Sequence, residues 1–170
     1  MKNKIYYENF KDAIERNRKK IPAVHKKLKA AGVQYVMSSW IDLHGIPKTK
    51  PVPMSDFEQL CLGKGPQFAV HSISFVPELT PADSDQIMLP DLDSVYICPW
   101  DKTMAIIFAD LYWEDKPYNV CPRQALKRAM QKAQDAGYKG MCGIEPEFIA
   151  MKYGDCLLYT SDAADEVLGV

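Results

Sequence analysis

Near the end of the chain stands the sequence Gly143-Ile144-Glu145-Pro146-Glu147-Phe148. In an extended strand, residues two apart point to the same face, so Glu145 and Glu147 share one face and their apolar neighbours share the other. Two carboxylates held side by side disfavour each other's charge unless a cation lies between them. Hard divalent cations such as Mg²⁺ and Mn²⁺ prefer oxygen ligands of this kind. The spacing is also typical of a solvated strand face with two acids, and both interpretations remain open at this point.

The composition is that of a globular protein with a core. The chain has 170 residues, of which 47% are hydrophobic and 25% charged, as expected for one domain or one small domain with part of another. The net charge of −1 gives no electrostatic reason to expect nucleic acid or a membrane as a partner. No apolar run reaches spanning length and the first residues lack the apolar core of a signal peptide, so we expect a cytoplasmic location.

The five cysteines and three histidines are scattered along the chain. The sequence contains no Cys-x-x-Cys pair and no Cys/His cluster, so it indicates neither a zinc site nor a disulfide framework. We therefore expect reduced thiols and no nucleophile–base pair among these residues.

The first part of the chain predicts helices. Apolar periodicity indicates one helix over residues 9–20 and a second over residues 22–31, with Pro22 between them and Gly32 as the stop. A third, short helix through Leu62 is expected to start with Ser55 as its cap.

A mixed sheet is expected to follow these helices. Residues 33–42 alternate as a strand, His44-Gly45 forms a turn, and residues 48–53 return as the second strand of a hairpin. The further strands expected are 68–75, 94–98 and 104–112.

The periodicity changes after a charged linker at residues 113–118. Residues 122–136 predict a helix, with Pro122 at its first position and Gly137 as its stop. The strand that carries the two glutamates is expected to begin at Tyr138.

Several short motifs, taken in order, resemble the glutamine synthetase family, and the resemblance covers roughly residues 32–151. The motifs are Ile41-Asp42-Leu43-His44-Gly45 with Lys48, Ser84-Asp85 with Leu89-Pro90-Asp91, Pro99-Trp100, Pro122-Arg123-Gln124-Ala125-Leu126-Lys127-Arg128-Ala129 and Gly143-Ile144-Glu145-Pro146-Glu147-Phe148. Each motif is weak alone, and their order and spacing carry the match.

The resemblance implies an α+β fold, in which an N-terminal β-grasp domain precedes the first helix and strand of a truncated glutamine synthetase catalytic domain. On this basis we expect an N-terminal helical extension over residues 1–32, the β-grasp domain over 33–118 and the start of the catalytic domain over 119–155. Residues 156–170 resemble one reading frame of a transposon-end adapter used in sequencing libraries, and we expect them to be a non-native tail.

The resemblance also implies a chemistry. Glu145 and Glu147 correspond to residues that bind the divalent metals, Mg²⁺ or Mn²⁺, of that family. ATP phosphorylates the side-chain carboxylate of glutamate, and ammonia or another amine displaces phosphate from the resulting γ-glutamyl phosphate. Asp85 aligns with an acid at a subunit interface that belongs to the catalytic site. The full-length protein is expected to form a homo-oligomeric ring, whereas this chain alone, which lacks the family's remaining ligands, is expected to be inactive.

Two departures from the family pattern are visible. Typical members read Phe-Asp-Gly-Ser-Ser where this chain reads Phe68-Ala69-Val70-His71-Ser72, so the acid that helps to bind ammonium is missing. A γ-glutamyl–amine ligase, for example one for methylamine, is therefore an alternative, and His71 could take over part of the lost role. Cys121 replaces an aspartate before Pro-Arg and is a poorer helix cap, at a cost of about 1 kcal/mol.

Two further readings remain open. The sheet region could be a free-standing β-grasp interaction module, although such a module would have no use for Glu145 and Glu147. A catalytically inactive family member with a regulatory role is the other.

Overall fold

The computed structural model describes residues 7–70 and 79–149. The chain divides into two compact units, Met1–Gly140 and Met141–Val170, and the first contains every helix and strand described below. The helices are α1 (Phe10–Ala30), α2 (Phe57–Gln59) and α4 (Pro122–Asp135), with 3₁₀ turns η1 (Met54–Asp56) and η3 (Leu92–Ser94) and a π-turn η2 (Leu60–Lys64). The strands are β1 (Tyr35–Ile41), β2 (Pro47–Pro53), β3 (Gln67–Phe68), β4 (Gln86–Pro90), β5 (Tyr96–Ile97), β6 (Met104–Trp113) and β7 (Lys116–Pro117).

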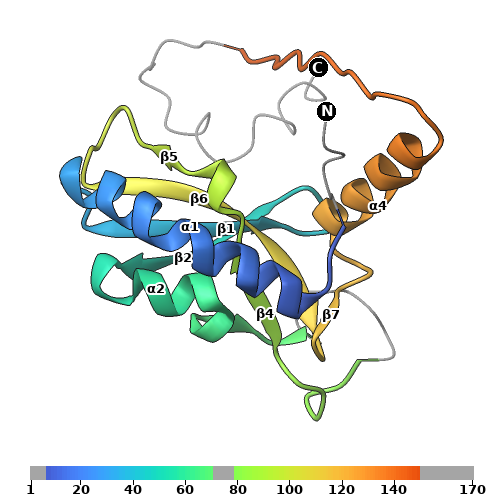
Figure 1. Cartoon of the computed structure of the whole chain (residues 1–170), viewed down its shortest axis with the longest axis horizontal. Coiled ribbons are helices and arrows are strands. Elements are labelled where there is room, and N and C mark those ends of the chain that lie inside the picture. Colours follow the sequence, from blue (N-terminus) through green and yellow to red (C-terminus); the bar gives the residue numbers. More distant parts are fainter. Residues whose placement is uncertain (1–6, 71–78, 150–170) are drawn as a thin grey trace, which may run out of the picture. The chain divides into compact units, whose positions relative to one another are not determined.

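The strands form one mixed sheet whose central strand is β6 (Figure 1). The order is β2-β1-β6-β4-β3, and β5 and β7 also pair with β6. Strand β1 is antiparallel to β2 and parallel to β6, and β4 is antiparallel to both β6 and β3. Because β1 and β6 are parallel, the chain must cross over between them, and the described elements in that interval are β2, η1, α2, η2, β3, β4, η3 and β5.

The core lies between one face of this sheet and the helices α1 and α2, which lie side by side in Figure 1. Ala105, Ile107 and Ala109 of β6 alternate toward this face and are fully buried. They join one cluster with Leu28 of α1 and Phe57 of α2. None of the described helices is long and apolar enough to cross a membrane.

Helix α1 runs without a break through Pro22, so the prediction of two helices was wrong. A proline inside a helix removes one backbone hydrogen bond at a cost of roughly 3 kcal/mol. The buried residues recur on one face of α1 both before and after Pro22, and they are Ala13, Asn17, Ile21 and Leu28. The packing of this continuous face against the sheet offsets the local cost, which periodicity alone could not reveal.

The two predicted helix stops are confirmed. Gly32 and Gly137 have positive φ angles of 80° and 82°. At the first, the amide of Gly32 donates to the carbonyl of Lys29 and the amide of Val33 to that of Leu28. Gly137 and Tyr138 repeat the arrangement. This is the Schellman motif, which a glycine in the left-handed region makes possible.

Local turn signals predicted the hairpin correctly. Strands β1 and β2 pair from Tyr35 with Pro53 to Ile41 with Pro47, and β6 confirms the apolar strand expected over residues 104–112.

Other expectations need correction. Ser55 caps no helix, because η1 begins after Pro53 and neither η1 nor α2 has a side-chain cap. The strand expected over 68–75 reduces to β3, and residues 71–75 lie outside the described residues. The strand expected over 94–98 reduces to β5, because Ser94 belongs to η3.

The strand expected from Tyr138 onward is absent from the described residues. Residues 138–149 have no helix or strand, and Ile144 and Phe148 are 86% and 87% exposed. A strand gains its hydrogen bonds from a neighbouring strand, and this segment has no pairing partner among the described residues.

Three glycine-to-alanine substitutions separate backbone strain from crowding. Gly32→Ala should lower the free energy of unfolding by about 1 kcal/mol, because its φ is positive while the space around it is open. Gly63→Ala should cost more, about 2 kcal/mol, because its φ is +75° and the added Cβ would lie 2.8 Å from Cζ of Phe10. Gly140→Ala is the control, since its φ is not positive and no atom lies within 4 Å. Urea unfolding measures all three, and an equal loss for Gly32→Ala and Gly140→Ala would contradict the role of Gly32.

Candidate functional site

The first motif that carries the family resemblance shapes the hairpin turn. Oδ1 of Asp42 accepts the backbone N–H groups of His44 and Ile46, both at 2.9 Å. Its other oxygen lies 3.3 Å from Nζ of Lys48, and the side chain is 1% exposed. Burial raises the pKa of Asp42, but the two backbone N–H groups and Lys48 lower it by a larger amount. The pKa of Asp42 is therefore below its usual value. Asp42 is therefore ionised and stabilises the turn between β1 and β2 through these contacts.

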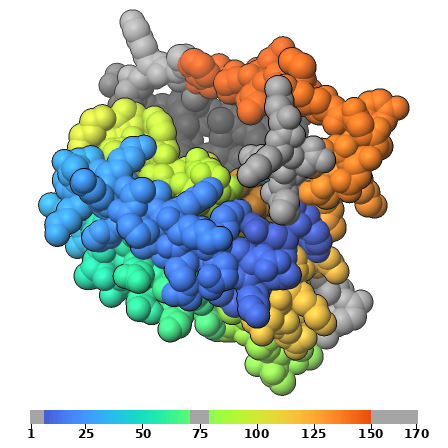
Figure 2. Space-filling model, in the orientation of Figure 1, coloured from blue at the N-terminus to red at the C-terminus, as the bar shows by residue number. Residues whose placement is uncertain are grey.

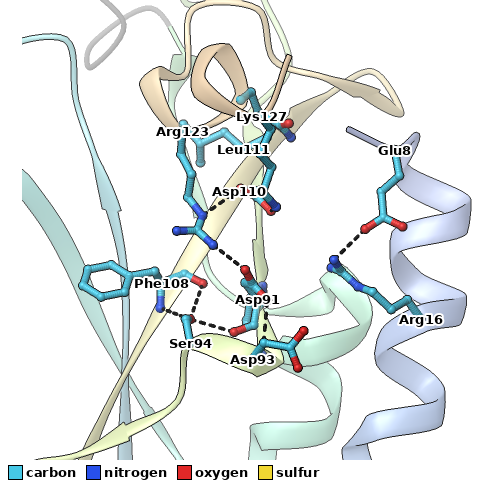
Figure 3. Close-up of polar contacts among 12 residues, drawn as sticks. Glu8, Arg16, Asp91, Asp93, Ser94, Phe108, Asp110, Leu111, Arg123 and Lys127 are labelled. Atoms are coloured by element: carbon cyan, nitrogen blue, oxygen red, sulfur yellow. Dashed lines mark hydrogen bonds and ion pairs between the residues drawn. The ribbon is translucent and has the colours of Figure 1, made fainter. Parts of the chain in front are cut away.

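Asp91 of the second motif and Arg123 and Lys127 of the fourth meet at a buried ion-pair network (Figure 3). Asp110, near the centre of β6, accepts a hydrogen bond from Nε of Arg123 at 3.0 Å. Lys127 donates to the second carboxylate oxygen of Asp110. Arg123 also pairs with Asp91, which follows β4. The carboxylate of Asp110 is only 2% exposed. We call Asp91, Asp110, Arg123 and Lys127 the α4 clamp, because it fastens α4 to the sheet.

Asp91 also organises the chain around the clamp. It begins η3, where its side chain accepts the amide of Asp93 at 3.2 Å. Ser94 in turn accepts the amide of Phe108 on β6 at 2.9 Å, as Figure 3 shows. Burial raises the pKa of Asp91, but the charges of Lys127 and Arg123 outweigh it and hold the pKa below its usual value.

A second ion pair lies beside the clamp. Glu8 pairs with Arg16 of α1 at 2.6 Å. Here burial dominates, and it raises the pKa of Glu8 despite the positive charges of Arg16 and Lys127. The pKa of Glu8 is thus raised and that of Asp91 is lowered, so the two side chains change the pH dependence of stability in opposite directions.

The clamp makes the inner face of α4 polar. Gln124 is 1% exposed and donates to the carbonyl of Leu111 at 3.3 Å. Leu126 and Met130, by contrast, are 59% and 38% exposed. A surface helix of a globular protein normally turns its apolar stripe toward the core. These two apolar residues of α4 are exposed instead, so charge and hydrogen bonding hold α4 in place within its unit.

The predicted metal residues lie in the second unit. Glu145 and Glu147 are exposed, on a stretch without helix or strand. Within the described ranges 7–70 and 79–149, no group of three or more His, Cys, Asp or Glu side chains is placed to hold a metal ion. Oxygen donors suit Mg²⁺ or Mn²⁺, but two carboxylates on an open stretch do not fill the six positions that such ions require.

Asp85, the predicted interface acid, is exposed and immediately precedes β4. The preceding residue, Ser84, is held by a hydrogen bond: its backbone carbonyl accepts the N–H group of Trp113 Nε1 at 3.0 Å. His71, the proposed substitute for the missing aspartate, lies outside the described residues.

The sequence analysis did not single out Asp110 and assigned no separate role to Lys127, which it named only as part of a motif. A signal was present, since an aspartate inside the apolar run 104–112 must find a cation when that strand is buried. Arg123 and Lys127 are four residues apart and share one helix face, which makes them natural partners for one carboxylate.

Removing the central charge of the clamp should be costly. We expect Asp110→Asn to lower the free energy of unfolding by about 3 kcal/mol, because Arg123 and Lys127 would lose their shared buried partner. Asp93→Asn is a matched control, since Asp93 is 62% exposed in its ion pair with Lys20 and should cost less than about 1 kcal/mol. Similar losses of unfolding free energy in the two variants, measured by urea unfolding, would contradict a stabilising role of the α4 clamp.

The clamp should also set an acid limit on stability. A lowered folded-state pKa means that the contribution of Asp91 is present above the unfolded pKa of about 3.9 and is lost as the pH falls through the folded value. The raised pKa of Glu8 acts the other way, so its contribution is present at low pH and is lost as the pH rises. Urea midpoints between pH 2 and pH 7 should fall less steeply on acidification in Asp91→Asn than in the wild type, and more steeply in Glu8→Gln. Parallel curves for all three proteins would refute both assignments.

The curated proteins that are similar to this chain include glutamine synthetases and a glutamate–methylamine ligase. No family model matches the chain. Glutamine synthetase from Rhizobium meliloti (strain 1021) is 35% identical over 136 residues, which cover 79% of this chain and 31% of the relative. Glutamine synthetase from Pyrococcus furiosus is 32% identical over 71% of this chain and 26% of its own length. Glutamate–methylamine ligase from Methyloversatilis universalis is 28% identical over 81% of this chain and 31% of its own length.

Two solved structures are also similar to this chain. A structure described as "GmaS/ADP complex" matches with a TM-score of 0.61 and 26% identity, over 66% of this chain and 26% of that one. An apo GmaS structure gives the same TM-score at 27% identity. The chain thus spans about a quarter to a third of the length of the relatives it matches. The mixed α/β fold, the motif order and these relatives together establish that the chain belongs to the glutamine synthetase family.

Proposed function

We propose that this chain is part of an ATP-dependent ligase that joins glutamate and ammonia to form glutamine through γ-glutamyl phosphate. The observation that carries the proposal is the similarity to curated ligases, which match 71–81% of the chain, and the ordered series of motifs agrees with it. Because the chain spans only part of those relatives, the activity belongs to the longer protein, and the 170-residue chain alone is inactive.

The proposed metal ligands are Glu145 and Glu147. Their carboxylates supply two of the oxygen donors for Mg²⁺ or Mn²⁺, and the remaining donors come from parts of the longer protein that this chain lacks. When bound, such ions neutralise the phosphate charge that develops during phosphoryl transfer. The exposure of both glutamates supports the proposal, because neither carboxylate is committed to a partner within the described part of the chain.

The proposed domain arrangement also rests on the similarity to the glutamine synthetase family. Residues 1–32 form a helical extension, residues 33–118 a β-grasp domain, and residues 119–155 the start of the catalytic domain. Asp85 acts at a subunit interface in a homo-oligomeric ring. Its exposure, directly before β4 and beside the anchored Ser84, supports that role because the side chain is accessible while its backbone is fixed.

A γ-glutamyl–amine ligase is the second candidate. The observation that favours it is Ala69, which stands where the family resemblance predicts the ammonium-binding acid. An alanine offers no negative charge to a small cation but leaves room for an alkyl group. The relative that uses methylamine is consistent with this choice.

Recovery of the complete protein allows the two acceptors to be compared. The ratio of kcat/KM for methylamine to that for ammonium reports acceptor preference directly. If Ala69 sets it, Ala69→Asp should shift the ratio toward ammonium by about tenfold, the effect of roughly 1.4 kcal/mol from one added charge contact. Ala82→Asp, at an exposed position before β4, is the control. A ratio that stays the same in Ala69→Asp would remove Ala69 from acceptor selection, and complete inactivity with both amines and glutamate would refute the ligase proposal.

The metal ligands are tested in the same complete protein. Glu145→Gln and Glu147→Gln should each lower kcat/KM by at least about a hundredfold and raise the Mg²⁺ concentration needed for half-maximal rate, since each removes one oxygen anion from the site. Glu114→Gln changes an exposed acid on the turn before β7 and should have no effect. Normal metal dependence in both variants would contradict the assignment. Phosphate release from the 170-residue chain that requires ATP, glutamate and metal would contradict its proposed inactivity.

A further inference from the structure

Strand β2 lies at one end of the sheet and pairs with β1 along one of its two edges. Helices cover one face of the sheet, where the surfaces of α1 (blue) and of the segment that contains α2 (green) meet in Figure 2. No strand among the described residues pairs with the other edge of β2, which we call the open edge. A strand from a second chain would have to bond to the backbone groups on this open edge.

The hydrogen bonds at the two ends of the hairpin show which residues of β2 face the open edge. The amide of Asp42 donates to the carbonyl of Ile46 at 3.1 Å. At the other end, the amide of Met54 donates to the carbonyl of Gln34 at 2.9 Å. Bonded and non-bonded pairs alternate in an antiparallel ladder, and the register between these two ends is continuous. The even-numbered residues of β2 therefore bond to β1, whereas the amides and carbonyls of the odd-numbered residues point toward the open edge.

Prolines occupy three of the four odd-numbered positions, and none of the even-numbered positions of β2 is a proline. The four odd-numbered residues, all exposed, are Pro47, Thr49, Pro51 and Pro53. Oγ1 of Thr49 donates to Oγ of Ser39 at 2.9 Å, as expected for a non-bonded pair, in which the side chains approach more closely. Because proline has no N–H group, Thr49 supplies the single backbone donor that β2 keeps on its open edge.

The two lysines of β2 do not guard the open edge. A charged side chain can keep an edge strand from pairing, but Nζ of Lys48 lies 3.3 Å from the carboxylate of Asp42. Nζ of Lys50 donates to the carbonyl of Gln67 at 2.6 Å and lies 4.3 Å from the ring centroid of Phe68. Both ammonium groups are thus held by partners within their own unit, and the prolines remain as the feature that distinguishes this edge.

We propose that Pro47, Pro51 and Pro53 close the open edge to strand addition, so that the sheet ends at β2 when copies of this chain meet. A strand placed there could donate to the four carbonyls but would receive one backbone hydrogen bond, from Thr49. Its other carbonyls would lose water without gaining a donor. The Cδ atom of each proline also takes the place of the hydrogen that would point at the added strand. This role concerns the association of chains and does not depend on the proposed ligase reaction.

Hydrogen exchange in the ¹⁵N-labelled 170-residue chain, followed by two-dimensional NMR, tests the direction of the amides. The amide of Thr49 should exchange at least about tenfold faster than those of Lys50 and Val52, because only the latter two donate to β1. Equal protection of all three amides would show that the Thr49 amide is bonded, and this result would overturn the proposal.

Opening the edge tests its closing role. Pro47→Thr combined with Pro51→Thr restores donors on both sides of Thr49, so this double variant should self-associate at least about tenfold more tightly than the wild type in sedimentation equilibrium. The amide of Thr49 should also become more protected as the protein concentration rises.

Pro81→Thr combined with Pro99→Thr is the matched control, since both prolines are exposed and lie outside the strands. This control should associate as the wild type does. Unchanged association of the edge variant, or equal association of the two double variants, would contradict the proposal. Loss of folding in the edge variant would contradict it as well, because the restored N–H groups are assigned no contact within the unit.

Discussion

The arrangement of the first unit depends on one buried carboxylate, that of Asp110. It lies near the centre of β6, where a charge without partners would be very costly, and it binds Arg123 and Lys127 at once. Arg123 reaches on to Asp91 after β4, so three elements far apart in the sequence meet there. The clamp explains why α4 can lie with Leu126 and Met130 exposed. Motifs that carry the family resemblance thus include residues whose work is architectural, since Asp42, Asp91 and Arg123 hold turns and helices in place.

The family motifs are divided between the two units. The architectural motifs lie in the first unit, Met1–Gly140, where their side chains have partners. Glu145 and Glu147 lie in the second, on an exposed stretch. This division agrees with a chain that spans about a quarter to a third of its relatives. In our proposal, the centre to which the two glutamates contribute is completed only in the longer protein.

Local signals in the sequence were sufficient for the turns but not for the longer contacts. Gly32 and Gly137 ended their helices as expected, and His44-Gly45 formed the hairpin turn, because these features depend on backbone freedom over a few residues. The prediction at Pro22 failed because packing along the whole of α1 outweighs one lost hydrogen bond. The strand from Tyr138 failed for the converse reason, since a strand needs a partner that local sequence does not specify. Asp110 was missed because its cations lie 13 and 17 residues further along the chain. Of the candidate site, the sequence alone named Asp85, Glu145 and Glu147, and their roles stay predictions.

An isotope experiment tests the proposed reaction most directly. The complete protein would be supplied with ATP, Mg²⁺, either amine and glutamate that carries ¹⁸O in its γ-carboxylate. If γ-glutamyl phosphate forms, one labelled oxygen becomes the bridge to phosphorus and leaves with it when the amine attacks the carbonyl carbon. Mass spectrometry of the released inorganic phosphate should then show one ¹⁸O atom per phosphate. Unlabelled phosphate released in step with the amide product would contradict the account.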